Sequence, residues 1–183
     1  GMETVRLSQR KIELNRLDKL IYSKVPSGFA IRETPHIYAQ QVDLSRLRCA
    51  RQVDLDRGYR SIGTLGGGNH FIEADKDDGG NFYLVIHTGS RNLGKQVAEA
   101  HQQLAVDLCS GKKELFDARR ELIARYKEEG RRQEIQGALA ALEAEFASHA
   151  PDFPPELCHL TGQYRDDYLE DMRICQQFAR RNR

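Results

Sequence analysis

The sequence predicts a mixed α/β (α+β) fold in which a small β-sheet is followed by long helices. Residues 71–74 and 82–86 are short apolar runs separated by Gly79 and Gly80, the pattern of two antiparallel strands joined by a turn. From Asn92 onward, apolar residues recur at the spacing of amphipathic helices. We therefore expect a small sheet core that carries a glycine-rich hairpin, with long helices and a helical hairpin after it.

The part of the chain before this hairpin is predicted to contain one long helix and two short elements. Residues 3–25 are charged and helix-forming, and Pro26 and Gly28 end this helix. Residues 39–44 have the composition of a short strand, and residues 53–59 that of a short helix. The apolar residues that define one face of the long helix are Leu7, Leu14, Leu17, Leu20 and Ile21.

The part of the chain after the hairpin is predicted to be helical almost throughout. A first helix covers residues 92–111, and two more, 112–129 and 131–149, are separated by Gly130. We expect residues 112–149 to be a helical hairpin inserted into the domain. A proline-marked linker at 151–155 then precedes a C-terminal helix. The apolar stripe of that helix is Tyr164, Tyr168, Met172, Cys175 and Phe178.

Length and composition predict a single cytoplasmic domain, residues 1–183, without a general affinity for nucleic acid. Charged residues make up 30% of the chain but the net charge is only +1, so nucleic acid must be bound by a local patch. No apolar run approaches the roughly 18 residues of a membrane span, and no signal-peptide pattern is visible. The four scattered cysteines form no CxxC pair, which argues against a zinc ribbon or a disulfide framework.

The main functional feature is a pair of histidines at the ends of the predicted strands. The sequence GGGNH ends at His70, and HTGSR begins at His87. Antiparallel pairing would set both histidines at the same end of the hairpin. Imidazole suits a transition metal, while arginine and the backbone N–H groups of glycine-rich loops suit phosphate. These residue types favour a site for a divalent metal and a phosphorylated ligand.

The glycine-rich stretch has other interpretations. Glycine turns and histidines at strand ends serve packing and turn geometry more often than binding. A P-loop is excluded because no Gly-Lys-Ser/Thr follows the glycines. A dinucleotide-binding fingerprint is excluded because the order strand, GxGxxG, helix is not found.

Two longer blocks of sequence decide between these interpretations. Residues 63–73, GTLGGGNHFIE, and residues 87–94, HTGSRNLG, resemble motifs of the RtcB-type RNA ligases. Residues 168–172 and 178–183 are similar to a third block of that family, and PSG at 26–28 is a weaker match. The blocks run in order along most of the chain, which is therefore identified as a member of this family.

The resemblance implies an enzyme that joins RNA ends carrying a 2′,3′-cyclic phosphate or 3′-phosphate to 5′-hydroxyl ends, in tRNA splicing and RNA repair. Such ligases use GTP and Mn²⁺ and proceed through a guanylylated histidine. By motif match, His70 and His87 would be metal ligands. The other residues that the resemblance implies are Gly68, Asn69 and Glu73 for the nucleotide, and Ser90 and Arg91 for RNA or nucleotide phosphates.

Parts of the family pattern are not found in this sequence. The Asp-x-Gly-Cys-Gly block, which gives the metals a carboxylate and a thiolate, is missing, and Cys49 lies in a different context. A later histidine ligand and the histidine that accepts GMP are also missing, so no catalytic residue is assigned. We expect an incomplete central portion of the ligase that is inactive alone. Exposed sheet edges or the helical hairpin could support a homodimer.

Two other functions remain as alternatives to the ligase. One is a truncated paralogue that binds RNA or phosphate without catalysis, with an affinity that falls as salt rises. The other is a metal-dependent phosphoesterase built on the same two histidines, for which no third strong ligand is visible. The ligase interpretation is favoured because the motifs are long and specific.

Overall fold

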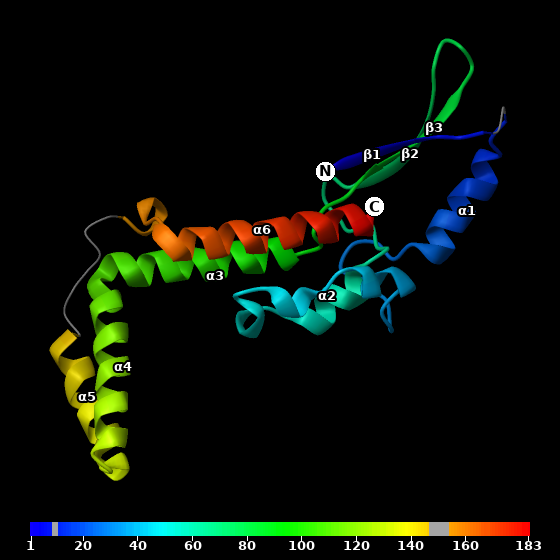
Figure 1. Ribbon diagram of the computed structural model, residues 1–183. Coiled ribbons are helices and arrows are strands. Elements are labelled where there is room, and N and C mark those ends of the chain that lie inside the picture. The colour runs from blue at the N-terminus through cyan, green and yellow to red at the C-terminus, as the bar shows by residue number, and fades with distance from the viewer. Residues whose placement is uncertain (9–10, 147–153) are drawn as a thin grey trace. The chain divides into compact units, whose positions relative to one another are not determined.

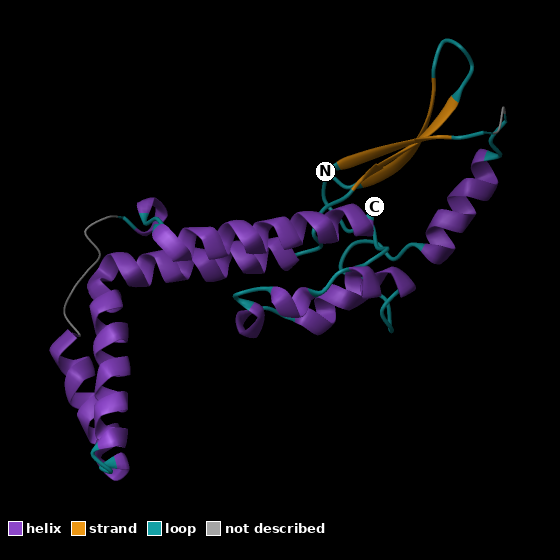
Figure 2. Ribbon diagram, viewed as in Figure 1, coloured by secondary structure: helices purple, strands orange, loops and turns teal. Residues whose placement is uncertain are grey.

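The computed structural model describes residues 1–8, 11–146 and 154–183 of the chain (Figure 1). Within these residues the chain forms three strands and six α-helices, with short 3₁₀ turns between them (Figure 2). The mixed fold class predicted from the sequence is confirmed. None of the helices in this part of the chain has the length and apolar character needed to span a membrane.

Contacts between residues divide the chain into two compact units. One unit comprises residues 1–98 and 167–183, and the other comprises residues 99–166. Helices α3 (Leu93–Asp107) and α6 (Gly162–Asn182) each begin in one unit and end in the other. The organisation as a single ligase domain with an insertion at 112–149 stays a prediction.

The sheet has three antiparallel strands in the order β1-β3-β2. Strands β2 (Phe71–Lys76) and β3 (Phe82–His87) form the predicted hairpin, in which Phe71 lies opposite His87. Because β1 and β2 have no further partner among the described residues, the sheet leaves two edges unpaired. The predicted homodimer through such edges stays a prediction.

Strand β1 (Met2–Arg6) was not predicted, and the first half of the expected helix at residues 3–25 is wrong. The chain instead pairs with the edge of β3, with Thr4 opposite Val85, and the helix α1 begins later, at Leu14–Lys24. The β-branched Thr4 and Val5 suit a strand. Their partner strand lies about eighty residues away in sequence, beyond the reach of a local pattern.

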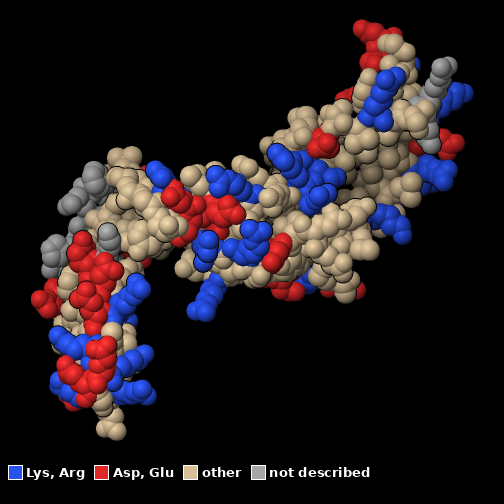
Figure 3. All heavy atoms as spheres, viewed as in Figure 1, with Lys and Arg blue, Asp and Glu red and all other residues tan. Residues whose placement is uncertain are grey.

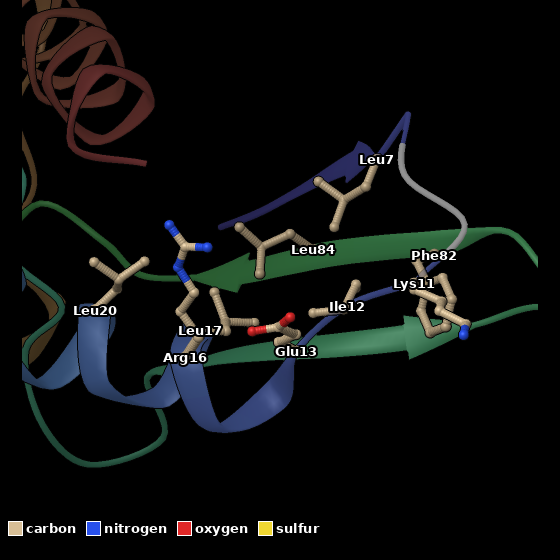
Figure 4. Close-up of a pocket in the computed structure, with 9 residues that line it drawn as sticks. All are labelled: Leu7, Lys11, Ile12, Glu13, Arg16, Leu17, Leu20, Phe82 and Leu84. Carbon is tan, nitrogen blue, oxygen red and sulfur yellow. The ribbon is translucent and has the colours of Figure 1, made fainter.

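Helix α1 and one face of the sheet line a groove of about 740 Å³. Leu17 and Leu20 of α1 line it together with Phe82 and Leu84 of β3, and Leu17 lies near Leu84 (Figure 4). No residue of α1 is buried, and Leu14, which was expected on the packed face, is 61% exposed. The helix therefore covers this face of the sheet only loosely.

The segment between α1 and β2 contains 3₁₀ turns and a short helix. The short strand predicted at 39–44 is wrong, because 3₁₀ turns form at Ile37–Gln41 and Leu44–Arg46. Side chains at their starts explain this, since His36 Nδ1 and Asp43 Oδ1 accept backbone N–H groups two residues later. The predicted helix at 53–59 is α2 (Leu55–Ser61).

The second unit contains two helices that pack against one another. Helices α4 (Lys113–Glu128) and α5 (Ile135–Phe146) are joined through Gly130, whose φ is +75°. Acidic and basic side chains are interspersed on the face of these helices that Figure 3 shows. The predicted end of the second helix, at residues 147–149, and the start of the linker at 151–153 lie outside the described residues.

Helix α6 buries a face that differs from the predicted stripe. Cys175 and Phe178 are buried as expected, but Tyr164 and Met172 are 36% and 37% exposed. The buried face of α6 includes two polar residues, Asp171 and Asn182, that were not part of the predicted stripe. The buried residues of α6 are Asp171, Ile174, Cys175, Phe178 and Asn182.

Candidate metal and phosphate site

The hairpin brings His70 and His87 together at one end of the sheet. His70 directly precedes β2 and His87 is the last residue of β3. Their ring centroids are 5.9 Å apart. The ring of Phe71 stacks on His87 at 5.3 Å with 17° between the planes, and so limits rotation of that imidazole.

Both imidazoles have an Nδ1 atom that is buried without a hydrogen-bond partner in the described part of the chain. Buried polar atoms in native proteins almost always have partners, so an orphaned Nδ1 atom on each of two neighbouring rings indicates that a ligand could bind there. With metal–nitrogen bonds of about 2.1 Å, two imidazole ligands of one ion have centroids no more than roughly 6.5 Å apart. The observed separation is compatible with a shared metal ion.

The protonation state of His70 also suits metal binding. Burial lowers the pKa of its imidazole below the ordinary value of 6.5, and the positive charge of Arg91 and the neighbouring His87 lower it further. The ring is therefore neutral at physiological pH. Metal ions bind the neutral form of imidazole, so no proton has to be displaced from this ligand.

Gly66 is required for the close approach of His70 and Arg91. Its φ is +94°, a conformation that favours glycine. A Cβ atom at this position would collide with Nη1 of Arg91 and Nδ1 of His70. The glycine-rich loop therefore leaves the space in which the imidazole and the guanidinium meet.

Arg91 is held in place by two loops that precede the hairpin. Its Nε donates to Thr64 Oγ1 at 2.8 Å and its Nη2 donates to the Gly28 carbonyl at 2.9 Å. These bonds use two of the five N–H donors of a guanidinium. Burial lowers the pKa of Arg91, yet an arginine remains cationic at neutral pH. The side chain is a fixed positive charge beside the histidines.

Ser90 and the start of α3 are less open than the sequence suggested. The Ser90 hydroxyl accepts the Gly94 N–H at 3.1 Å, and its carbonyl accepts the Leu93 N–H at 3.0 Å. Ser90 therefore caps α3 with its own backbone and side chain. Arg91 and Asn92, which follow, have φ values of +50° and +72°, an uncommon conformation for residues other than glycine.

Gly68, Asn69 and Glu73 are all exposed. No hydrogen bond or ion pair joins the side chain of Asn69 or of Glu73 to another described residue. Glu73 lies opposite Val85, so it is on the same face of the hairpin as His87, two residues further along. The structure thus brings His70, His87 and Arg91 together and leaves the predicted nucleotide contacts facing solvent.

Comparison with known proteins identifies the family. The family described as tRNA-splicing ligase RtcB matches residues 37–183, which is more than half of the chain. The chain belongs to the RtcB family. The matched region includes both histidines and excludes β1 and α1.

Individual RtcB relatives match shorter segments. The RNA-splicing ligase RtcB of Escherichia coli K12 is 40% identical over 47 residues, which are 26% of this chain and 12% of that protein. RNA-splicing ligase RtcB homolog 2 of Entamoeba dispar is 32% identical over 114 residues, which are 54% of this chain and 18% of that protein. In both cases the chain spans less than a fifth of the relative's length. No solved structure matches the chain significantly.

The histidine pair of this RtcB-family chain has no third protein ligand among the described residues. No other histidine, cysteine, aspartate or glutamate places a ligand atom close enough to both imidazoles to complete a three-residue metal group. Cys49 does not belong to the pair. Its pKa is raised to about 12, by burial first and then by the Asp171 carboxylate, so the thiol is not a ready thiolate ligand.

Two buried polar residues of α6 hold loops in place, one of them at the histidine site, and were not found from the sequence. The Asp171 carboxylate is fully buried and accepts the backbone N–H groups of Arg48 and Cys49 at 2.7 and 3.1 Å. Asn182 is 5% exposed and bonds to the loops that carry the two histidines. The sequence contains a pattern that could have identified them. Asp171, Cys175, Phe178 and Asn182 are spaced four, three and four residues apart, as residues on one face of a helix are.

Proposed function

We propose that this chain carries part of the metal and nucleotide site of a GTP- and Mn²⁺-dependent RNA ligase. The reaction would join RNA ends with a 2′,3′-cyclic phosphate or 3′-phosphate to 5′-hydroxyl ends. Membership of the RtcB family supports the reaction class. The observation that carries the proposal is the pair of buried, unpartnered Nδ1 atoms of His70 and His87 within the matched region.

In this proposal His70 and His87 hold Mn²⁺. When bound, the ion would supply Lewis-acid stabilisation of charge on phosphate oxygens. The protein fixes the ligands beforehand, because Phe71 stacks on one imidazole and Gly66 packs beside the other. Preorganised ligands lose little conformational entropy on binding.

Arg91 is proposed to bind a phosphate of RNA or nucleotide. Its bonds to the Thr64 hydroxyl and the Gly28 carbonyl orient the guanidinium, and the remaining donors can meet an anion in the bidentate manner of arginine. Ser90 is proposed to assist at the same loop. Gly68, Asn69 and Glu73 are proposed to contact GTP, which their exposure permits.

Titration with Mn²⁺ by calorimetry tests the metal site. We expect binding by the unaltered chain and its loss in a His70→Ala/His87→Ala double variant. His36→Ala is the matched control, since His36 caps a 3₁₀ turn and lies outside the pair. Equal binding by all three proteins would contradict the assignment of both ligands.

RNA binding separates the ligase from the non-catalytic alternative. If Mn²⁺ does not bind but RNA does, with an affinity that falls as salt rises, the RNA-binding paralogue is favoured. We expect no transfer of label from GTP to this chain, because no histidine that accepts GMP is assigned in it, and Mn²⁺-dependent labelling would contradict that expectation. Arg91→Ala should weaken RNA binding, whereas Arg119→Ala on α4 should leave it unchanged.

A further inference from the structure

The side chain of Asn182 makes hydrogen bonds to both loops that carry the histidines. Its Oδ1 accepts the backbone N–H groups of Gly63 and Thr64 at 2.9 and 3.2 Å. Its Nδ2 lies 3.1 Å from the Thr64 carbonyl, 3.1 Å from Thr88 Oγ1 and 3.2 Å from the Gly89 carbonyl. The amide thus joins residues that precede His70 to residues that follow His87.

These partners fix the orientation of the amide. Two N–H donors face the oxygen, and two carbonyl oxygens face the nitrogen, so the reversed amide would place like groups against each other. The side chain is buried, and a buried backbone group that loses its hydrogen-bond partner is costly. An amide of this length is therefore required at this position.

The residues that Asn182 bonds to lie next to the two histidines in sequence or in space. Thr88 directly follows His87, and its hydroxyl donates to the Leu65 carbonyl at 2.7 Å. Gly66, next to Leu65, packs beside His70 Nδ1, and a Cβ on Gly89 would lie 3.7 Å from His70 Nε2. The two loops are therefore coupled to each other, and Asn182 bonds to both.

We propose that Asn182 is a positioning residue for the histidine pair. By bonding to the loop at residues 63–64 and the loop at residues 88–89, its amide sets the spacing of the His70 and His87 imidazoles. The inference rests on the proposed function in one respect: the spacing of the two imidazoles matters because they bind Mn²⁺. Residues that orient metal ligands typically contribute roughly tenfold to a hundredfold in affinity.

The test uses the 183-residue chain with Asn182 changed to Asp or to Gln. Asn182→Asp keeps the size but removes the donor that serves Thr64, Thr88 and Gly89. Asn182→Gln keeps the amide but displaces it by one methylene, and remains informative if the Asp variant does not fold. Arg181→Ala, on the exposed face of the same helix turn, is the control for α6.

Two readouts are needed. The first is the ¹⁵N chemical shifts of the His70 and His87 rings in the metal-free protein, and the second is the affinity for Mn²⁺. We expect either folded variant to shift both histidine signals and to weaken Mn²⁺ binding by roughly tenfold or more. Arg181→Ala should change neither.

A purely structural role is distinguished by a variant that only destabilises α6. Phe178→Leu removes packing from a fully buried side chain and should lower the midpoint of urea unfolding without shifting the histidine signals. Folded Asn182 variants with wild-type histidine signals and wild-type Mn²⁺ affinity would overturn the proposal. If the unaltered chain binds no Mn²⁺, the proposed function fails, and the histidine signals still decide the role of Asn182.

Discussion

The loops around the histidines and the α4–α5 helix pair are stabilised in opposite ways. The loops depend on buried hydrogen bonds between residues far apart in sequence, such as those of Asn182 with Thr64 and Thr88. The helix pair depends on local backbone bonds and on exposed ion pairs such as Arg119 with Glu143, 3.1 Å apart. Buried polar bonds are costly to break, whereas exposed ion pairs contribute little. Substitutions should therefore have large effects in the loops and small ones in the helix pair.

The largest effect is expected for Gly66→Ala. The new Cβ would require φ near +94° and would collide with Arg91 and His70, so we expect the unfolding free energy to fall by about 3 kcal/mol. Urea denaturation measures the change. Gly68→Ala is the matched control, since its φ is +72° with nothing within 4 Å of the new atom, and about 1 kcal/mol is expected. An equal loss of unfolding free energy in the two variants would show that Arg91 and His70 move aside and avoid the collision.

Thr88→Val should have the next largest effect. The change removes the hydroxyl that donates to Leu65 and accepts from Asn182, and so leaves the Leu65 carbonyl without this donor. We expect a loss of about 2 kcal/mol in the free energy of unfolding. Thr4→Val, on the exposed strand β1, should change it by less than about 0.5 kcal/mol. A neutral result at Thr88 would contradict the coupling of the two loops.

The buried thiols near Asp171 predict a loss of stability at alkaline pH. Burial is the main cause that raises the pKa of Cys49 to about 12 and that of Cys175 to about 11, from 9.0. Because the folded state holds these protons more tightly, its advantage is present below pH 9 and is lost as the pH rises through 11 and 12. From pH 8 to pH 10 we expect each thiol to lower the unfolding free energy by about 1 kcal/mol.

Urea denaturation at the two pH values, on the unaltered chain and a Cys49→Ala/Cys175→Ala variant, measures this contribution. The pH dependence should be shallower in the variant, because lysines and tyrosines titrate in both proteins and cancel in the comparison. Identical pH dependence would show that neither thiol is shielded as the structure indicates.

The smallest effect is expected in the helix pair. A double-mutant cycle on Arg119 and Glu143 should give a coupling energy below about 0.5 kcal/mol, and 0.5 M NaCl should reduce it further. A coupling above about 1 kcal/mol would show that this ion pair is more than a surface contact.

The sequence predicted those elements whose signals are local. The β2–β3 hairpin is encoded by two apolar runs and a glycine turn, and α2 by its own short pattern with Asp54 as cap. The antiparallel register then follows and places His70 beside His87. The length of the apolar runs and the polarity of the residues beside them were sufficient to predict these features.

Features that depend on distant partners could not be predicted in the same way. Strand β1 forms because β3 offers an edge, and residues 2–6 alone carry too weak a pattern to reveal it. The hydrogen bonds of Asn182 join residues more than ninety positions apart. The polar residues on the apolar face of α6 were the available clue, since Asn182 follows Phe178 by one helical turn.

The bonds made by Asn182 also set an order of events during synthesis. The ribosome releases the chain from its N-terminus, so both histidine-bearing loops emerge long before Asn182, which is 119 residues beyond Gly63. The α4–α5 pair is made of near neighbours and can form as soon as it emerges. The histidine site is thus completed only after Asn182 has emerged, although the residues of both loops are made much earlier.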